Sequence, residues 1–501
     1  MVDKIYTIEE LDNIPLYKLR LILRDMGGTP GNKTVGKIKE EIMDIQSGKI
    51  LPTPTKRGRK PKSSDDNPIT FNDSGAVDLG IPTESTKEPL QNRGNGSDYV
   101  PAYSAESYYE DGVSAPYSVQ VRDVEAEEPI KIIVASGVLE VRNEGYGFLR
   151  TITYGDKRKD YYVEKQIIKT YALRTGDYVV GHAINKNSPN SFSLCEVMKI
   201  NGIPREAYVR GYDYDSTTAV FPNQSLISPL EEEKTARVID LVAPVALGQR
   251  GLIVAPPKTG KTTLLKNLAQ AISNEHPNAH LMLLLIDERP EEVTDFEQGI
   301  FKCELIASTF DQSPAHHIFH AEMAIERAKR LVESGNEVVI LMDSITKLTR
   351  AYNLVVPSTG KTLSGGLELE ALVRAKKLFG SARKLREGGS LTIIATALVD
   401  TGSRMDDLIY EEFKGTGNME IHLSRELAQR RVFPAVDILQ SGTRKEELIF
   451  TEDKLIASRK IRKLFEVRNN VTETLIEMIR LSKNNEDLIR KLDGWLKAIL
   501  E

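Results

Sequence analysis

A loop between a predicted strand and a predicted helix most strongly constrains the fold of this chain. The apolar run Gly-Leu-Ile-Val at 251–254 is typical of a buried strand, and 264–272 has the apolar spacing of a helix. Between them, residues 255–263 read Ala-Pro-Pro-Lys-Thr-Gly-Lys-Thr-Thr. This is the setting of a phosphate-binding loop, although Ala255 stands where the strict pattern has glycine. The order of strand, loop and helix therefore predicts an α/β domain that binds a nucleoside triphosphate.

The loop residues have separate predicted roles. Backbone N–H groups around Thr259 and Gly260 are expected to face the phosphates, and Lys261 to reach the β- and γ-phosphates. The Thr262 hydroxyl is expected to bind Mg²⁺, and the helix N-terminus at Thr263 adds its positive dipole. The loop thus predicts a nucleotide with its magnesium ion.

The composition sets the class of protein. The chain has 501 residues, of which 40% are hydrophobic and 28% charged, as in a soluble protein of about three domains. No apolar run approaches the roughly 20 residues of a membrane span, and the first residues lack a secretory layout, so we expect a cytoplasmic location. The net charge of −5 argues against a surface that coats nucleic acid, so any such contact should be local. Cys195 and Cys303 lie far apart, which argues against a disulfide framework or a thiolate zinc site.

Periodicity and composition divide the chain into five predicted regions. A small helical module over 1–48 precedes a polar linker over 49–128, which we expect to be disordered because few aliphatic residues are available for burial. Short β-rich runs broken by turns over 129–203, among them separate runs at 132–134 and 137–141, predict a small closed barrel of the OB type. A connector over 204–230 leads to 231–501, where alternating strands and helices predict a mostly parallel sheet and a helical tail.

Two features leave alternatives open. The basic cluster Lys-Arg-Gly-Arg-Lys-Pro-Lys at 56–62 suits phosphate binding and suits a solvated tail equally well. His316 and His320 share a helical face that could hold a metal ion, but no third ligand lies in the same turn. A packing or surface role is favoured for these histidines.

Two other predicted strands end in acidic residues. One apolar run precedes Glu288 and another precedes Asp343, and parallel strands bring their C-terminal ends to one crevice. We expect Asp343 to hold the Mg²⁺ shell and Glu288 to polarise the attacking water. Phosphoryl transfer also needs a cation at the γ-phosphate, which a second subunit can supply. The candidates, which spacing alone does not rank, are Arg430, Arg431 and Arg444.

The barrel segment carries a second signature. Tyr146 and Phe148 alternate at period two on one strand face with Arg150 beyond them, which suits the stacking of unpaired bases. Tyr161 or Tyr162 on a neighbouring strand would extend the platform. Residues 129–203 contain 11 Lys and Arg against 7 Asp and Glu, a balance of +4 in an acidic chain. We therefore predict that the barrel binds single-stranded nucleic acid.

Several longer motifs resemble the family of bacterial transcription termination factor Rho. These are the phosphate loop region 251–262, Leu-Ile-Asp-Glu-Arg-Pro-Glu-Glu-Val at 285–293, Met-Asp-Ser-Ile-Thr at 342–346, Glu-Glu-Phe-Lys-Gly-Thr-Gly-Asn at 411–418 and Ser-Gly-Thr-Arg-Lys-Glu-Glu at 441–447. The resemblance extends from about 132 to 447 and includes the barrel motif at 145–150. It implies a RecA-like P-loop ATPase domain behind an OB-type RNA-binding barrel.

The resemblance also implies an activity and partners. Members of the family form a ring of six subunits, bind nascent RNA, and hydrolyse ATP with Mg²⁺ at subunit interfaces. They move along RNA as 5′–3′ helicases and release transcripts from the RNA polymerase elongation complex. The roles implied for the nucleotide site are phosphate and Mg²⁺ binding by Lys258, Lys261 and Thr262, catalysis by Glu288, metal association by Asp343, a phosphate-side cation at Arg289, an arginine finger at Arg444, approach to the neighbour's nucleotide by Arg431 and adenine contact by Phe433.

Two loops resemble the RNA-gripping loops of the family's central channel. The first covers 356–365 and contains Lys361, and the second covers 401–404 and ends in Arg404. Both contain glycine and a cation, as a mobile loop that grips a nucleic-acid backbone requires. Tyr146, Phe148, Arg150 and Tyr162 match the family's primary RNA site. The linker over 49–128 departs from the shortest members, so its role is open.

Two other functions fit parts of the sequence. A rotary-ATPase catalytic subunit has the same alternating core but does not need a base-stacking barrel. An RNA-binding or RNA-chaperone protein would use nucleotide only as a structural ligand. Hydrolysis, and its dependence on single-stranded RNA, distinguish these alternatives from an RNA-driven motor.

Overall fold

The fold is described from a computed structural model of the chain. It describes residues 11, 19, 22, 23, 26, 35–47, 131–156, 158–185, 191–227, 233–299, 302–358, 360, 362–464 and 470–500. The linker over 49–128 with its basic cluster at 56–62, and Lys361, lie outside these residues. In the N-terminal region, helix α3 (Val35–Gln46) contributes Ile38 and Ile42 to a small apolar cluster with Leu11, Leu19 and Leu23.

Residues 132–204 form a small closed barrel. The sheet order is β3-β2-β1-β4-β5-β6, and β3 also pairs with β5, which closes the sheet. Alternate residues point inward and form one apolar core that includes Leu139, Leu149 and Val179. The elements are β1 (Ile132–Val141), β2 (Gly147–Arg150), β3 (Tyr161–Val163), α4 (Lys165–Thr170), β4 (Tyr178–Asn185), β5 (Phe192–Ile200) and β6 (Ile203–Pro204).

Strand β1 differs from the sequence-based expectation of two short runs at 132–134 and 137–141. The structure joins them into one continuous strand. A Cβ on Gly137 would lie 2.8 Å from the carbonyl oxygen of Arg150 on β2. Glycine at this position therefore permits a close approach of two strands, whereas the sequence pattern favoured a break in the strand.

A connector joins the barrel to the second domain. It contains η1 (Tyr214–Ser216) and β7 (Ala219–Val220), and β7 pairs with the short strand β12 (Arg383–Leu385) of the large sheet. Tyr214 is fully buried, and its hydroxyl donates a 2.6 Å hydrogen bond to the carbonyl of Ser381. The connector is therefore built into the second domain.

A large mostly parallel sheet forms the centre of the second domain. Its order is β10-β9-β11-β13-β8-β14-β15, and only β15 on this path runs antiparallel to its neighbour. Continuous apolar runs in the inner strands account for their burial on both faces. The strands are β8 (Arg250–Ala255), β9 (His280–Glu288), β10 (Glu304–Thr309), β11 (Glu337–Asp343), β13 (Ser390–Leu398), β14 (Met419–Leu423) and β15 (Val436–Thr443).

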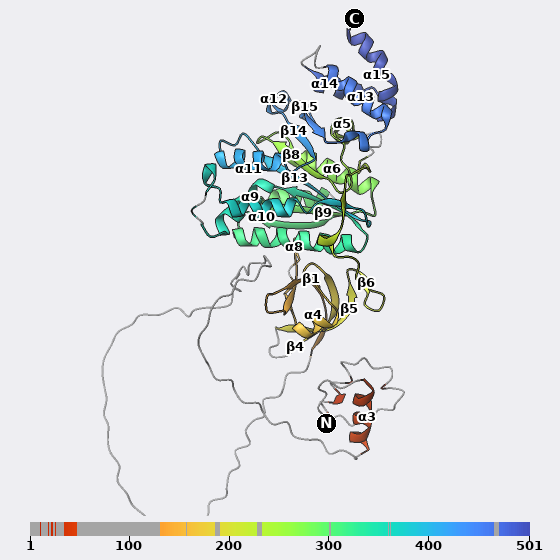
Figure 1. The fold of residues 1–501 in the computed structure, drawn as a ribbon, viewed down its shortest axis with the longest axis vertical. Helices are drawn as coiled ribbons and strands as arrows, with labels where there is room; N and C mark the ends of the chain where they lie inside the picture. The colour runs from red at the N-terminus through yellow and green to blue at the C-terminus, as the bar shows by residue number, and fades with distance from the viewer. Residues whose placement is uncertain are drawn as a thin grey trace, which may run out of the picture.

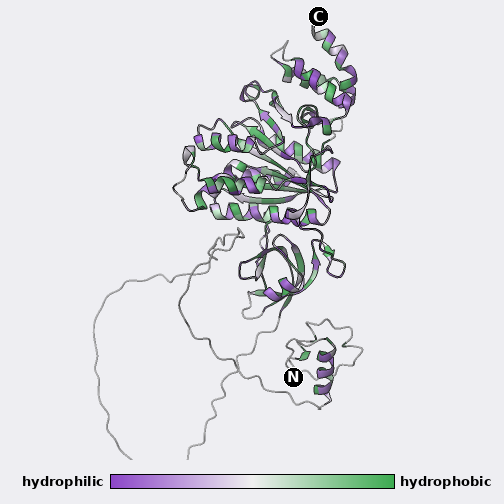
Figure 2. Ribbon diagram, viewed as in Figure 1, coloured by the Kyte–Doolittle hydropathy of each residue, from purple (hydrophilic) through white to green (hydrophobic). Residues whose placement is uncertain are grey.

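Helices cover both faces of this sheet (Figure 1). One buried cluster joins the sheet to α5, α6 and the C-terminal helices, and the other joins it to α8, α9, α10 and α11. The helices show polar outer faces in Figure 2, as amphipathic cover of a sheet requires. The helices, with two 3-10 turns, are α5 (Lys234–Val242), α6 (Lys261–Glu275), α7 (Pro290–Gly299), α8 (Pro314–Glu333), α9 (Ile345–Val355), η2 (Ser364–Gly366), α10 (Leu369–Phe379), α11 (Arg404–Lys414), α12 (Arg425–Gln429), η3 (Glu446–Leu448), α13 (Glu452–Lys463), α14 (Val471–Arg480) and α15 (Asn485–Leu500).

Local sequence explains how the longest helix begins and ends. Ser313 caps α8, because its side chain accepts a hydrogen bond from the backbone N–H of His316, and Pro314 occupies the first helical position. Gly335 adopts a φ of 84° just beyond the helix. The histidines of this helix are half-buried or buried: His317 contacts Ser308, and His316 and His320 pack ring against ring.

The C-terminal helices pack on the second domain around a buried cation. Arg237 on α5 is 2% exposed and donates hydrogen bonds to the carbonyl groups of Ile479 and Ser482 and to the Asn485 side chain. Leu475 on α14 and Leu488 on α15 belong to the same apolar cluster as α5 and α6. The predicted tail is therefore part of the domain core.

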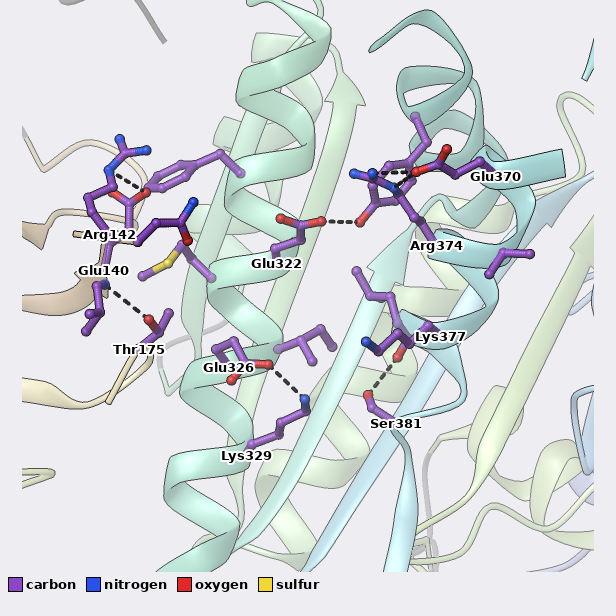
Figure 3. A pocket seen from close by; sticks show the side chains of 18 residues that line it. Glu140, Arg142, Thr175, Glu322, Glu326, Lys329, Glu370, Arg374, Lys377 and Ser381 are labelled. Atoms are coloured by element: carbon purple, nitrogen blue, oxygen red, sulfur yellow. Dashed lines mark hydrogen bonds and ion pairs between the residues drawn. The ribbon is translucent and has the colours of Figure 1, made fainter. Parts of the chain in front are cut away.

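The barrel rests on helix α8. A Cβ on Gly176 would lie 2.4 Å from the carbonyl of Glu326, so the two backbones meet without a side chain between them. Arg174 of the barrel pairs with Glu333 at the end of α8. Beside this contact, the barrel, α8 and α10 together line a cavity of about 740 Å³, with Glu140 of the barrel and Arg374 of α10 on either side of α8 (Figure 3). Across the described part of the chain, no helix is long and apolar enough to cross a membrane.

Candidate functional site

The phosphate loop lies between β8 and α6, as the sequence predicts. Lys258 and Gly260 have φ values of 66° and 88°, and these left-handed residues turn the loop before α6 begins at Lys261. Thr259 is buried, and its hydroxyl donates a 2.7 Å hydrogen bond to the carbonyl of Pro256. The loop is therefore closed by its own contacts, with Lys261, Thr262 and Thr263 at the helix N-terminus.

Lys261 joins the loop to the acidic strand ends. Its Nζ lies 2.6 Å from Asp343 Oδ1 and 3.9 Å from Glu288 Oε2. Burial by itself would lower the pKa of Lys261, but the charges of Asp343 and Glu288 outweigh it, and the pKa is raised. The lysine therefore stays protonated and ready for a phosphate.

Asp343 is the most enclosed acid of the site. It is 0% exposed, and its Oδ1 accepts hydrogen bonds from Lys261 and from the Thr396 hydroxyl on β13, both near 2.7 Å. Its Oδ2 is buried with no hydrogen-bond partner among the described residues. An orphaned carboxylate oxygen is a ligand that Mg²⁺ accepts. Thr262, which follows Lys261 at the start of α6 and whose hydroxyl donates to Glu292 at 3.2 Å, offers a second oxygen, and the donor set of these residues fits a magnesium ion.

Glu288 ends β9 beside a local irregularity of the sheet. Asp287 has a φ of 55°, and the register between β9 and β10 shifts at Thr309. This bulge turns Glu288 inward, where it is 4% exposed and accepts a 2.8 Å hydrogen bond from Lys347 Nζ. Burial first, and the charge of Asp343 second, raise the pKa of Glu288. A carboxylate with a raised pKa is suited to act as a general base.

The loop before β15 lies at the same end of the sheet as the phosphate loop. A Cβ on Gly260 would lie 3.3 Å from the ring of Phe433, so the ring packs against the phosphate loop of its own subunit. Arg431 stands two residues earlier on this loop and is exposed. The structure thus brings Phe433 to the nucleotide site, and it places Arg431 at that end too.

Arg444 lies at the opposite end of the sheet. Because β15 is antiparallel, it begins at Val436 beside Leu423 and ends at Thr443 beside Met419, which is level with Gly251 at the start of β8. Because β15 contains an irregularity, it spans only the four-residue rise between Leu423 and Met419, so Thr443 lies about 13 Å along the sheet from the phosphate-loop end at 3.3 Å per residue. The exposed Arg444 side chain therefore does not belong to the nucleotide site of its own subunit.

The remaining arginine candidates differ in their surroundings. Arg289 is exposed directly after Glu288, on the nucleotide side of the sheet. Arg430 pairs with Glu473 on α14, which gives it a structural partner within the domain. Geometry therefore separates candidates that spacing in the sequence could not rank.

The aromatic residues of the barrel form one cluster. Phe148 on β2 pairs in register with Tyr162 on β3, and their ring centroids lie 5.8 Å apart. Tyr146 lies 5.8 Å from Phe148 and 5.7 Å from Tyr162. All three side chains are half-buried, whereas Tyr161 points into the barrel core. The structure therefore selects Tyr162 over Tyr161 for the predicted platform.

Arg150 lies beside this cluster but its charge is already paired. Its guanidinium stands 4.7 Å from the centroid of the Phe148 ring and contacts the carboxylates of Glu140 and Asp160. It also lies 5.7 Å from the ring of Phe319 on α8. Arg150 thus orients the aromatic cluster and offers little free charge to a phosphate.

The two predicted channel loops meet. A Cβ on Gly365 would lie 2.8 Å from the backbone nitrogen of Met405, next to Arg404 at the start of α11. Asp406 holds this junction, because it accepts hydrogen bonds from Arg350 on α9 and from the Thr401 hydroxyl. Arg404 itself is exposed. Lys361 of the first loop lies outside the described residues.

Comparison with known proteins distinguishes the Rho family from the alternative functions that fit parts of the sequence. Residues 235–443 match the model of the ATP synthase alpha/beta family, nucleotide-binding domain, which also describes the core expected of a rotary ATPase. Residues 135–206 match the model of the Rho termination factor, RNA-binding domain. The barrel match therefore favours the Rho family over a rotary-ATPase subunit.

Curated relatives decide the family. The transcription termination factor Rho of Cereibacter sphaeroides is 49% identical over 71% of this chain and 86% of its own length. The Rho factors of Bacillus subtilis and Escherichia coli K12 are 48% and 49% identical over 74% and 72% of this chain, and over 87% and 88% of their own lengths. The chain belongs to the Rho transcription termination factor family.

Membership of the Rho family confirms several predictions. The fold is a RecA-like P-loop ATPase domain with an OB-type RNA-binding barrel. The protein is an ATP-hydrolysing, RNA-dependent enzyme of transcription termination, and RNA is its partner. An RNA-binding protein with a merely structural nucleotide does not fit this family.

Sequence reasoning missed three residues that hold the site. Lys347 contacts the Glu288 carboxylate and the carbonyl of Asp287, Thr396 contacts Asp343, and Glu292 contacts Thr262. A signal existed for Lys347, because it follows Asp343 by four residues and lies in the first turn of α9. No such signal marks Thr396 in the sequence, because a threonine within an apolar strand is common.

Proposed function

We propose that this protein works as a ring of six copies that hydrolyses ATP between subunits, moves along single-stranded RNA and releases transcripts from RNA polymerase. The position of Arg444 is the observation that carries this proposal. A phosphoryl-transfer site needs a cation at the γ-phosphate, and the matching arginine lies at the far end of the sheet from its own phosphate loop. A neighbouring copy can present its Arg444 to that loop.

The surface around Arg444 supports an interface between copies. Phe221 is 60% exposed, Leu439 on the edge strand β15 is 55% exposed, and Leu448 on η3 is 43% exposed. Large exposed apolar side chains, one of them on an unpaired edge strand, mark a surface that another protein covers. A second copy that covers this surface would bring its phosphate loop to Arg444.

The residues divide the proposed reaction among themselves. Lys261 and Lys258 bind the phosphates, and the backbone N–H groups of Thr259 and Gly260 face them. Glu288 accepts the proton of the attacking water, and Lys347 holds its carboxylate in place. When bound at Thr262 and Asp343, Mg²⁺ neutralises charge on the β- and γ-phosphates. Phe433 packs against the adenine, and the neighbour's Arg444 stabilises the charge that develops as the bond breaks.

The RNA contacts divide into two sets. Tyr146, Phe148 and Tyr162 stack bases on the barrel, and Arg150 orients them. The channel loops at 356–365 and 401–404, with Lys361 and Arg404, grip the strand near the centre of the ring. Asp406 links the second loop to α9, whose N-cap Ser344 directly follows Asp343, so a change at the nucleotide has a short path to the RNA loops.

A mixing experiment tests the shared site. Lys261→Ala removes the phosphate lysine and Arg444→Ala removes the finger, so each variant alone should lose RNA-stimulated ATP hydrolysis. Co-expressed together, they form some interfaces with an intact loop from one copy and an intact finger from another. Recovery of hydrolysis in the mixed assembly supports the proposal, and an Arg444→Ala protein that hydrolyses ATP at the wild-type rate contradicts it. Mass measurement of the assembly and a nuclease-treated sample complete the test, because hydrolysis should depend on RNA.

A further inference from the structure

The turn that carries Arg444 is held by a residue of the connector. The ammonium group of Lys445 lies 3.7 Å from the centroid of the Phe221 ring, the shortest cation-to-ring distance among the described residues. Phe221 directly follows β7, far from Lys445 in sequence. It is 60% exposed, so it is not a core residue. An exposed phenylalanine that contacts one lysine beside the predicted arginine finger needs an explanation.

The backbone on both sides of Arg444 is fixed in different ways. Before it, the Thr443 hydroxyl donates a 2.9 Å hydrogen bond to the carbonyl of Pro244, and the N–H of Arg444 donates one of 2.9 Å to the carbonyl of Asn418. After it, Lys445 adopts φ 57° and ψ 42° before η3 begins. Residues with a side chain disfavour this left-handed conformation, so a contact that restrains Lys445 is needed to hold the turn.

Phe221 is itself anchored to the large sheet. Val220 of β7 pairs with Lys384 of β12, and β12 pairs with β13. The ring is thus presented from a fixed strand. A lysine ammonium over an aromatic face is attracted by the negative charge of the ring face. The contact therefore ties the turn after Arg444 to the body of the domain.

We infer that Phe221 is a positioning residue for Arg444: its ring holds Lys445 and so fixes the direction in which the arginine leaves the subunit. This inference rests on the proposed role of Arg444 at a neighbour's nucleotide. An arginine that acts across an interface gains from a fixed starting direction, because less freedom is lost when it meets the phosphate. Phe221 itself does not touch the nucleotide.

The test uses the full-length assembly and matched pairs of variants. Phe221→Leu keeps an apolar side chain but removes the ring face, and Phe221→Tyr keeps the face. Lys445→Met removes the charge at similar length, and Lys445→Arg keeps it. Phe221→Leu and Lys445→Met should each lower the kcat of RNA-stimulated hydrolysis by about 3- to 30-fold and leave the KM for ATP unchanged. Phe221→Tyr and Lys445→Arg should keep turnover near the wild-type value.

The double variant distinguishes positioning from independent packing. If Phe221 acts only through Lys445, then Phe221→Leu combined with Lys445→Met loses no more turnover than either change alone. The inference would be overturned if the two losses of turnover multiply in the double variant. It would also be overturned if Phe221→Leu turns over at the wild-type rate, or if only the KM or only the mass of the assembly changes.

Arg444→Ala separates this inference from the function on which it rests. If Arg444→Ala hydrolyses ATP normally, the proposed finger is wrong and the role of Phe221 falls with it. If Arg444→Ala is inactive while Phe221→Leu and Lys445→Met turn over normally, only the positioning role is wrong.

Discussion

The nucleotide site and the aromatic platform of the barrel are built on opposite plans. The nucleotide site gathers buried charges from the ends of several strands, with Asp343 and Glu288 almost fully enclosed, and the cation that we propose for it, Arg444, lies at the other end of the sheet. The platform gathers Tyr146, Phe148 and Tyr162 from two adjacent strands, and each ring keeps part of its surface open. If Arg444 serves a neighbour as we propose, the catalytic site is divided between subunits, whereas the three rings of the platform all come from one subunit.

Removing the arginine finger should give the largest effect, and it tests whether the catalytic site is divided between subunits. Arg444→Ala should lower RNA-stimulated turnover by about 10³- to 10⁵-fold, because a finger stabilises charge only in the transition state. ATP affinity, measured by equilibrium binding of a fluorescent nucleotide, should stay near the wild-type value. Arg430→Ala is the matched control, since Arg430 already pairs with Glu473. Equal loss of binding and turnover would mean that Arg444 does not act as a separate catalytic cation.

Glu288→Gln should reduce turnover by about 10²- to 10⁴-fold, because it removes the group that takes the proton from water. The wild-type rate also has a predicted pH dependence. The base must be ionised, and burial raises the Glu288 pKa, so activity should fall on acidification at a higher pH than an ordinary glutamate would give. Lys347→Met removes a charge that lowers this pKa and should move the acid limb of kcat to still higher pH. An unchanged limb would exclude Glu288 as the titrating base.

Phe148→Ala tests whether the platform works alone. The loss of one stacked base should weaken RNA affinity by about 5- to 150-fold, equivalent to about 1–3 kcal/mol. Nucleotide affinity without RNA should not change, and Phe148→Tyr, which keeps a ring face, should bind nearly as well as the wild type. A filter-binding titration with a short single strand measures both variants. Wild-type affinity in Phe148→Ala would remove the platform from RNA binding.

Arg150→Gln should give the smallest effect, a loss of only a few fold in RNA affinity. Its guanidinium is already paired with Glu140 and Asp160, so little charge remains for a phosphate. The slope of log affinity against log salt should therefore change by much less than the roughly 0.7 expected for one phosphate contact on a single strand. A full change of slope would show that RNA displaces the two acids.

The sequence predicted the parts of the molecule that depend on local order. A loop between a strand and a helix, and acids at the ends of strands, identify Lys261, Glu288 and Asp343 because parallel strands share one edge. The position of Arg444 depends instead on the reversal of β15, which no periodicity reveals. The pairing of Arg150 depends on cross-strand register, with Glu140 on β1 and Asp160 in the loop before β3. Gly137 was misread because a glycine for close strand contact and a glycine for a turn look alike in sequence.

The reversal of the last strand has a consequence for the life of a newly made chain. If the finger serves a neighbour, a solitary copy carries two unlike halves of a catalytic centre and no whole one. Such a copy can bind ATP in its phosphate loop but hydrolyses it slowly. ATP hydrolysis in the cell would then begin only after the copies have assembled. The direction of β15 would thereby prevent hydrolysis by unassembled subunits.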